Sequence, residues 1–334
     1  MNNWRRGSPL ALALSSLWLL AAASIGAQTA SRKAQTFHNP VLTGAADPFI
    51  TYTHGKYYLL YTDVSGNKSI TVRSSASLAT LGTAPAMPVY DTGGFFESPE
   101  LFQFGKLWYI HYTQYPNTVK ALESDTDNPQ GKYHLKATLT TNTYDADLLK
   151  MPSGALYLLS SDFNNIFIQP MKNPYTVSGG QTSIAHRDQD WEVGAIEAPN
   201  AFWHHGQLFI LYSAGNYNKD NYAANALRFN GGDPARPGAW SKLPGPLFTE
   251  NPAGGIWYAG VPSAFTSPGG LDWLAYSDYN NPDEADAHRS ILVQPMRFDS
   301  RNNPILGTAI PLPQPISLPS GDPTAPAIPA QRIR

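Results

Sequence analysis

The chain has 334 residues, of which 42% are hydrophobic and 14% are charged, and its net charge at neutral pH is −2. This composition excludes a chain that is disordered throughout, and the lack of a basic excess excludes a nucleic-acid partner. There is no cysteine, which excludes disulfides, zinc–thiolate sites and thiol nucleophiles, while 27 Gly and 29 Pro predict many turns between short strands.

The N-terminal segment has the pattern of an export signal over residues 1–27. Arg5 and Arg6 precede an apolar run at residues 10–23, which is too short for a helix that spans a bilayer. We therefore expect cleavage after Ala27 and an exported protein, periplasmic or extracellular, that has no membrane partner. An N-terminal membrane anchor is the alternative. Residues 28–36 are expected to form a short lead-in.

A hairpin pattern then recurs five times. In the first copy, Asp47 opens a short strand, Gly55 lies in a turn, and residues 57–62 form a dense aromatic and aliphatic strand that ends in Thr62. Each later copy also has a strand, a Gly-containing turn and a second apolar strand that ends in Ser or Thr. These later copies open at Pro99, Asp145, Glu197 and Val261.

The repeat predicts an all-β fold, a single-domain five-bladed β-propeller over residues 37–312. The segments between the hairpins contain further strand candidates and lack the 3.6-residue periodicity of helices, which leaves about four strands for each blade. A β-sandwich is the alternative, but it does not account for the regular repetition. Residues 313–334 are rich in Pro and predict an extended tail. We expect the protein to be a monomer.

Acidic residues stand where three of the copies open, at Asp47, Asp145 and Glu197. Because the inner strand of every blade points one end at the central channel, we expect these residues at equivalent positions around it. Like charges in one cavity raise each other's pKa, an arrangement that functional sites use. Glycoside hydrolysis needs one protonated and one ionised carboxyl group, so the trio predicts that chemistry. Each residue could instead be structural, in a turn or at a blade edge.

Four motifs, in order along the chain, resemble glycoside hydrolase family 43. They are Asn39-Pro40-Val41 with Ala46-Asp47-Pro48-Phe49, Pro99-Glu100-Leu101 with Leu107-Trp108-Tyr109-Ile110, Asp145-Ala146-Asp147-Leu148-Leu149 with Leu156-Tyr157-Leu158, and Glu197-Ala198-Pro199 with Leu211-Tyr212-Ser213. The resemblance implies an inverting hydrolase in which Asp47 is the general base and Glu197 is the general acid. It also implies that Asp145 orients Glu197 and tunes its pKa.

Further segments resemble the arabinofuranosidase branch of that family, namely residues 168–176, Trp191-Glu192, 291–296 and 304–307. This resemblance implies an α-L-arabinofuranosidase that acts on arabinan- or arabinoxylan-type polysaccharides and oligosaccharides. A β-xylosidase and an endo-arabinanase of the same family are the alternatives. A non-catalytic sugar-binding propeller and a retaining fructan-processing enzyme are more distant ones, and the complete acidic trio favours catalysis over sugar binding alone.

Two segments depart from the family pattern. Glu97-Ser98 stands before Pro99 where the family has Trp-Ala, which removes an aromatic wall and adds a charge near the channel mouth. The segment Ala259-Gly260-Val261-Pro262-Ser263 lacks the His that the family links to a bound metal. We therefore expect no cofactor and no metal, although His288 could partly replace the missing His.

Four residues are candidates for binding the sugar. Trp191 and Tyr258 lie near blade openings, where flat rings can stack on sugar C–H faces, although packing between blades accounts for either ring equally well. Arg289 could hydrogen-bond sugar hydroxyls or pair with Asp47, and a surface cation is the alternative. Glu100 matches a position of the family motif, where it could bind substrate or be structural.

Overall fold

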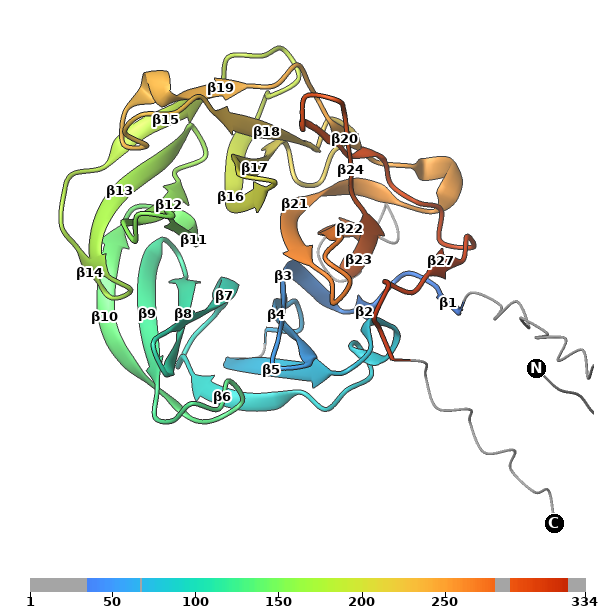
Figure 1. The fold of residues 1–334 in the computed structure, drawn as a ribbon, viewed down its shortest axis with the longest axis horizontal. Helices are drawn as coiled ribbons and strands as arrows, with labels where there is room; N and C mark the ends of the chain where they lie inside the picture. Colours follow the sequence, from blue (N-terminus) through green and yellow to red (C-terminus); the bar gives the residue numbers. More distant parts are fainter. Residues whose placement is uncertain (1–34, 67, 280–288, 324–334) are drawn as a thin grey trace, which may run out of the picture. The chain divides into compact units, whose positions relative to one another are not determined.

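The structure is a computed structural model that describes residues 35–66, 68–279 and 289–323, all within one compact unit, Ala34–Arg334. These residues form strands and three short 3-10 turns, and no α-helix occurs among them. Five sheets stand as blades around a central channel (Figure 1). The predicted all-β, five-bladed propeller is therefore confirmed. The predicted export signal lies outside the described residues, within which no helix is long and apolar enough to cross a membrane.

The central strands of each blade form an antiparallel sheet, and one inner strand of each faces the channel (Figure 1). Blade 1 contains β3 (Ala45–Thr53), β4 (Lys56–Asp63), β5 (Ser69–Ser75) and β6 (Met87–Asp91). Blade 2 contains β7 (Phe96–Phe104), β8 (Leu107–Gln114), β9 (Thr118–Ser124) and β10 (Tyr133–Thr141). Blade 3 contains β11 (Tyr144–Lys150), β12 (Leu156–Ser161) and β13 (Asn165–Asn173), with β14 (Thr176–Val177) and β15 (Thr182–His186) on its outer edge.

The last two blades take up additional short strands. Blade 4 contains β16 (Ala195–His204), β17 (Gln207–Gly215), β18 (Ala223–Phe229), β19 (Trp240–Lys242), β20 (Phe248–Thr249) and β26 (Gly307–Thr308). Blade 5 contains β21 (Trp257–Thr266), β22 (Asp272–Tyr279), β23 (Arg289–Pro295) and β2 (Leu42–Thr43). The only parallel pair in the described blades is β20 with β26 in blade 4. The inner strands, which face the channel, are β3, β7, β11, β16 and β21 (Figure 1). The other short elements are β24 (Arg297–Phe298), β25 (Pro304–Ile305), η1 (Leu78–Thr80), η2 (Pro237–Ala239) and η3 (Pro252–Gly254).

Strands from the two ends of the described chain close the ring. β2 pairs with β23, so the last blade contains a strand from the start of the propeller. β1 (Thr36–Phe37) pairs with β27 (Ile316–Ser317), and the backbone N–H of Leu78 donates to Asp322 at 2.9 Å. Part of the segment expected to be an extended tail thus packs on the propeller. The physical reason is that this Pro-rich segment still carries an apolar side chain, Ile316, which is buried between blades 5 and 1.

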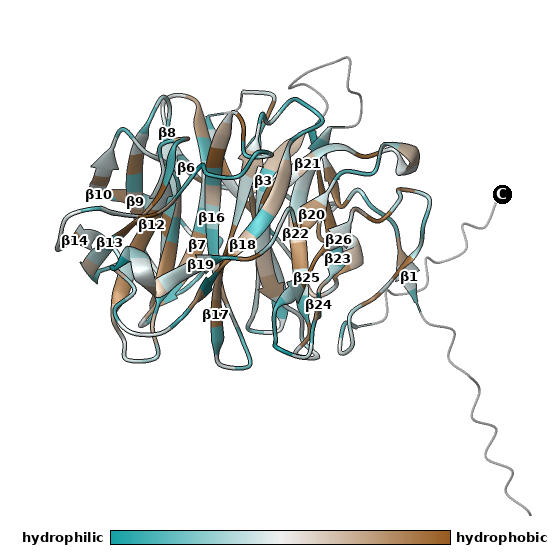
Figure 2. Ribbon diagram, turned by 90° about the horizontal axis from the view of Figure 1, so that it is seen from above, coloured by the Kyte–Doolittle hydropathy of each residue, from teal (hydrophilic) through white to brown (hydrophobic). Residues whose placement is uncertain are grey.

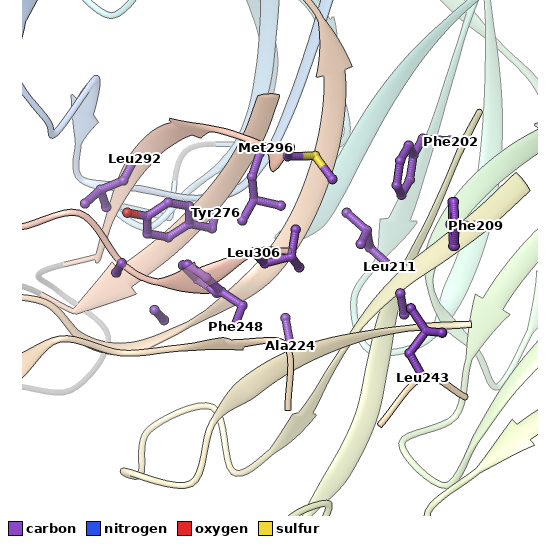
Figure 3. Packing of buried hydrophobic residues seen from close by; sticks show 14 of the residues in the cluster. Phe202, Phe209, Leu211, Ala224, Leu243, Phe248, Tyr276, Leu292, Met296 and Leu306 are labelled. Carbon is purple, nitrogen blue, oxygen red and sulfur yellow. The ribbon is translucent and has the colours of Figure 1, made fainter. Parts of the chain in front are cut away.

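Five hydrophobic clusters in the described residues hold the blades together, one at each junction between neighbours. In β4, Tyr57 and Leu59 face blade 5, whereas Tyr58 and Leu60 face blade 2. Because both faces of such a strand are buried, it is a continuous apolar run rather than an alternating one. Figure 2 shows the hydrophobic segments along the strands, and Figure 3 shows the cluster between blades 4 and 5.

In β21 two non-glycine residues, Tyr258 and Val261, have a left-handed backbone. The inner strand of every blade has such a residue at one equivalent position, which is that of Val261 in β21. The φ angles of these five residues lie between 49° and 53°. At each of them the pairing with the second strand shifts register, as it does in a β-bulge. We call them the bulge residues, and they are Asp47, Ser98, Asp145, Ala198 and Val261.

The backbone N–H of each bulge residue points out of its own sheet and donates to the preceding blade. In four blades the acceptor is a hydroxyl at the end of the second strand of that preceding blade. These hydrogen bonds, 2.7–3.0 Å long, run from Asp47 to Ser277, from Ser98 to Thr62, from Asp145 to Thr113 and from Val261 to Ser213. The Ser and Thr that end the repeated strands in the sequence therefore join neighbouring blades at the channel.

The shared bulge arranges the channel residues in three layers. The upper layer contains the residues before the bulge residues, the middle layer contains the bulge residues, and the lower layer contains the residues two positions after them. The upper layer is Ala46, Glu97, Tyr144, Glu197 and Gly260. The lower layer is Phe49, Glu100, Asp147, Asn200 and Ser263.

We expect Thr113→Val to lower the free energy of unfolding by about 1–3 kcal/mol, because the N–H of Asp145 loses its acceptor while the side chain keeps its shape. Thr113 is fully buried, so water cannot replace the hydroxyl. Urea unfolding measures the effect. Thr138→Val, at an exposed position of β10, is the control and should change the free energy by no more than about 0.5 kcal/mol. Equal stability of the two variants would contradict the role of this hydrogen bond.

Candidate active site

A pocket of about 330 Å³ opens at the upper end of the channel. Residues of the upper and middle layers from all five blades line it, together with residues of outer strands and connections. This volume is at the lower end of the roughly 300–1,000 Å³ that is usual for small-ligand sites. The lining residues are Asp47, Thr62, Val64, Phe95, Glu97, Tyr144, Asp145, Phe163, Glu197, Tyr217, Tyr222, Val261 and Arg289.

Asp47 of blade 1 is held at the pocket floor by a residue of its own blade and a residue of blade 5. Its Oδ2 accepts a hydrogen bond from the Thr62 hydroxyl at 2.6 Å, and its Oδ1 lies 3.3 Å from the guanidinium of Arg289. Thr62 in turn accepts the N–H of Ser98, so one hydroxyl orients the carboxylate and joins blades 1 and 2. A carboxylate held in this way can accept a proton from a water molecule in the pocket.

Asp145 of blade 3 replaces a hydroxyl in the ring of hydrogen bonds between blades. The N–H of Ala198 donates to its Oδ2 at 3.0 Å, where the other blades use Ser or Thr, and Ser98 donates to its Oδ1 at 2.8 Å. Burial, followed by the charge of Asp47, raises the pKa of Asp145 to about 6 in spite of these donors. Asp145 is thereby fixed against the residue that follows Glu197 in the chain.

Glu197 of blade 4 is buried at the end of the pocket beside Asp145. Its Oε1 accepts a hydrogen bond of 2.6 Å from the hydroxyl of Tyr222. Burial is the largest effect on this carboxyl group, the charge of Asp145 adds to it, and together they raise the pKa of Glu197 to about 8. At neutral pH Glu197 is therefore protonated and can donate that proton to a bound molecule.

The absence of a side chain at Gly260 leaves the space that the ring of Tyr222 fills. A Cβ atom on Gly260 would lie 2.1 Å from Cε1 of Tyr222, so the upper layer of blade 5 has no side chain where the tyrosine ring packs. The residue type at position 260 thus decides whether Tyr222 can reach Glu197. The sequence shows Gly260 only as part of an apolar segment, and it gives no sign that a ring from another blade fills the space.

Arg289 is the one cationic residue among the described residues that line the pocket. Besides its contact with Asp47, its guanidinium lies 5.5 Å from the ring centroid of Tyr279. The predicted pairing of Arg289 with Asp47 is therefore present in the structure. A single cation faces several carboxyl groups here, which is the arrangement that separates their protonation states.

From the repeat we expected Glu197 at the position equivalent to Asp47 and Asp145. In the structure this expectation is wrong by one residue. Asp47 and Asp145 are bulge residues of the middle layer, whereas Glu197 precedes the bulge residue Ala198 and belongs to the upper layer. The extra residue of the bulge reverses the alternation of side chains. A proline marks the offset in the sequence, since Pro48 directly follows Asp47, whereas Pro199 follows Ala198 and not Glu197. The residue of blade 2 that corresponds to Glu197 is Glu97.

Glu100 lies in the lower layer, below the pocket and not in its wall. Burial, followed by the charge of Asp147, raises the pKa of Glu100 well above its usual value. Asp147 itself accepts the N–H of Ala201 in the next blade at 2.6 Å. These contacts give the lower layer a structural part in joining the blades.

Trp191 and Tyr258 also lie away from the pocket wall. The indole of Trp191 donates to Gln189 and stacks on Tyr212 in the junction between blades 3 and 4. Tyr258 packs edge-on against the ring of Tyr279, 5.5 Å away. Packing, the alternative weighed for both rings, describes these contacts.

The aromatic part of the pocket comes from residues that the sequence pattern does not mark. Tyr144 stacks on Phe163 with ring centroids 4.3 Å apart, and Phe95, Tyr217 and Tyr222 add further ring surface. Most of them lie in connections or next to strand ends, where no periodic pattern exists. The only feature of the sequence that these aromatic residues share is that they lie within a few residues of a strand end.

The residues between the middle and lower layers do not fit a His-ligated metal. A cavity of about 20 Å³ lies there, and blade 5 contributes Val261, Pro262 and Ser263 to it. The first two side chains are apolar, and the Ser263 hydroxyl donates to the backbone oxygen of Pro48 at 2.6 Å. No group of three or more His, Cys, Asp or Glu suited to a metal occurs within the described ranges.

Comparison with known proteins agrees with the four motifs. The model of the glycosyl hydrolases family 43 matches residues 37–304. An extracellular exo-α-(1→5)-L-arabinofuranosidase of Streptomyces chartreusis is 31% identical over 273 residues, which are 70% of this chain and 82% of that protein. α-L-Arabinofuranosidase 43 of Humicola insolens is 27% identical over 327 residues, which are 88% of this chain and 67% of that protein.

Solved structures show the same fold. An α-L-arabinofuranosidase from Lactobacillus brevis has a TM-score of 0.76 at 23% identity, over 83% of this chain and 98% of that one. A xylan β-1,4-xylosidase from Bacillus halodurans C-125 has a TM-score of 0.71 at 17% identity, over 87% of this chain and 60% of that one. At these identities the likeness concerns the fold alone.

We expect Gly260→Ala to destabilise the protein by about 1–3 kcal/mol, because the added methyl group overlaps the ring of Tyr222. The matched control is Gly238→Ala, since an exposed Cβ there would meet no atom within 4 Å. Thermal unfolding of both variants measures the difference. A Gly260→Ala protein as stable as the control would mean that Tyr222 does not occupy this space.

Proposed function

Because the chain belongs to family 43 of the glycosyl hydrolases, we propose that it is an α-L-arabinofuranosidase that cleaves its substrate with inversion at the anomeric carbon. The substrates would be arabinan- or arabinoxylan-type polysaccharides and their oligosaccharides. The observation that carries this proposal is the meeting of Asp47, Asp145 and Glu197 in one pocket, each with different partners. The naming of the relatives as arabinofuranosidases supports the choice of sugar.

Glu197 is the proposed general acid. Its pKa of about 8 keeps it protonated at neutral pH, and the hydrogen bond from Tyr222 fixes the direction of its carboxyl group. As the bond between the anomeric carbon and the leaving oxygen breaks, that oxygen takes the Glu197 proton. Positioned proton transfer of this kind contributes about 10²–10⁴ in rate.

Asp47 is the proposed general base. Its carboxylate is oriented by Thr62 and Arg289, on a different blade from Glu197. A water molecule between Asp47 and the sugar attacks the anomeric carbon from the face opposite to the leaving group and passes its proton to Asp47. One displacement with water as the nucleophile inverts the configuration.

Asp145 is the proposed positioning residue of the acid. It holds the N–H of Ala198, next to Glu197 in the chain, and its charge raises the pKa of Glu197. Without that charge, Glu197 would lose its proton at a lower pH. Asp145 therefore acts on the reaction through Glu197 and not on the sugar itself.

The size of the pocket supports removal of single sugars from chain ends. Its volume of about 330 Å³ is that of a site for a small ligand, and its walls come from all five blades. Export and the monomeric state stay predictions, and the description of two relatives as extracellular supports the former. Hydrolysis of an aryl α-L-arabinofuranoside, an aryl β-xyloside and linear arabinan tests the sugar and the mode of action. Preference for the xyloside or the interior of arabinan would contradict the proposal.

We expect Asp47→Asn and Glu197→Gln each to lower kcat/KM on an aryl α-L-arabinofuranoside by about 10²–10⁴-fold without loss of folding. Phenols that are good leaving groups need little protonation, so they should restore Glu197→Gln far more than Asp47→Asn. Steady-state kinetics over a series of phenols measures this. Asp127→Asn, at an exposed position, serves as the control. Greater restoration of Asp47→Asn would reverse the roles of acid and base, equal restoration would contradict the assignment of either role, and full activity of both variants would place the catalytic groups elsewhere.

In the proposed mechanism, the fall of kcat/KM at alkaline pH reports loss of the proton of Glu197. Asp145→Asn removes a negative charge that raises the pKa of Glu197, so this fall should move to lower pH. Tyr222→Phe removes a donor that lowers that pKa, so the fall should move to higher pH. The opposite signs are the test, because general damage to the site would move both in one direction or neither.

A further inference from the structure

Glu97 occupies in blade 2 the position that Glu197 occupies in blade 4. Each directly precedes the bulge residue of its inner strand, with φ angles of 50° at Ser98 and 52° at Ala198, and each lines the pocket. We propose that Glu97 binds a hydroxyl group of the sugar in this pocket and so determines which sugar is accepted. The inference rests on the proposed function, because it names a specificity-determining residue of that site.

The four carboxyl groups of the pocket differ in their hydrogen bonds. Asp47, Asp145 and Glu197 each accept hydrogen bonds that fix them to the protein. The carboxyl group of Glu97 makes no hydrogen bond or ion pair with any residue in the described part of the chain. Its donor and acceptor are therefore directed to the pocket and to whatever the pocket holds.

The state of charge of Glu97 also fits contact with a sugar hydroxyl. Burial, followed by the charges of Asp47 and Asp145, raises the pKa of Glu97 to about 8, against the opposing effect of Arg289. At neutral pH the group is protonated, and a neutral carboxyl group has one O–H donor and a free carbonyl acceptor. It can thus donate to one sugar hydroxyl and accept from it or from its neighbour. A bound hydroxyl also satisfies a half-buried polar group that the protein leaves without a partner.

The place of Glu97 in the ring separates this role from that of a second proton donor. Glu97 stands in blade 2, next to blade 1 with Asp47, whereas blade 3 lies between it and the Glu197 of blade 4. Glu97 is therefore a neighbour of the proposed base, and a whole blade separates it from the acid. A sugar in the pocket would present its ring hydroxyls to this side and its leaving oxygen to Glu197.

The test uses Glu97→Met, which keeps the length of the side chain but cannot form hydrogen bonds. We expect kcat/KM on the aryl arabinofuranoside to fall about 10- to 100-fold, in line with loss of a hydrogen bond in a closed site. Glu97→Gln, whose amide can donate and accept, should recover about tenfold of that loss. Gln103→Met, exposed on the same strand β7, is the matched control and should leave kcat/KM unchanged.

The decisive readout is selectivity for one hydroxyl. Aryl α-L-arabinofuranosides that lack the 2-, 3- or 5-hydroxyl are compared in the wild type and in Glu97→Met. For one of them the effect of the mutation should fall below about twofold, because the partner of Glu97 is already absent. The same loss with every substrate would overturn the proposal and leave Glu97 a structural or charge-tuning part of the pocket.

Failure of the proposed role of Glu97 can be distinguished from failure of the proposed function. If the wild type prefers another pentoside, the arabinofuranosidase assignment fails and the same comparison is made with deoxy forms of the preferred sugar. If no glycoside is cleaved, calorimetric titration of the wild type and Glu97→Met with L-arabinose and D-xylose replaces kinetics. Weaker sugar binding by Glu97→Met supports the inference, and equal or absent binding by both proteins overturns it.

Discussion

One backbone feature organises this protein: a left-handed residue in each inner strand whose N–H donates to the preceding blade. The conformation is unfavourable for a residue with a side chain, and most of all for β-branched Val261. The blades maintain it because every bulge satisfies an N–H across a junction whose apolar faces are already packed. The backbone strain is therefore located at the channel. There the bulges direct the side chains of consecutive residues, such as Tyr144 and Asp145, toward the pocket.

The chemistry of the pocket follows from one substitution in that ring. Where four blades use a hydroxyl as the acceptor, the junction of blades 3 and 4 uses the carboxylate of Asp145. A negative charge is thereby built into the scaffold next to Glu197, whose pKa rises to about 8, while Arg289 stands beside Asp47 at the other side. A structural hydrogen bond and the separation of an acid from a base thus depend on the same residue.

The sequence was sufficient for the propeller and for three of the pocket carboxyl groups. Second strands such as residues 57–62 are buried on both faces, so their dense apolar runs repeat visibly, and the acids stand next to them. Alignment of the acids with one another hides the offset of Glu197, although Pro48 and Pro199, which directly follow the bulge residues of blades 1 and 4, reveal it. The positions of Trp191 and Tyr258 could not be predicted, since nearness to a blade opening does not say which side of the sheet a ring faces. Tyr222 depends on a space left by Gly260, a contact between blades that only the folded chain creates.

The proposed mechanism requires a single displacement by water, with Asp47 and Glu197 on opposite sides of the sugar. Proton NMR of the first sugar released from an aryl α-L-arabinofuranoside tests this most directly, before mutarotation mixes the anomers. Inversion predicts that β-L-arabinofuranose is the first product. The α anomer as the first product would contradict it, because retention requires a carboxylate that attacks the sugar.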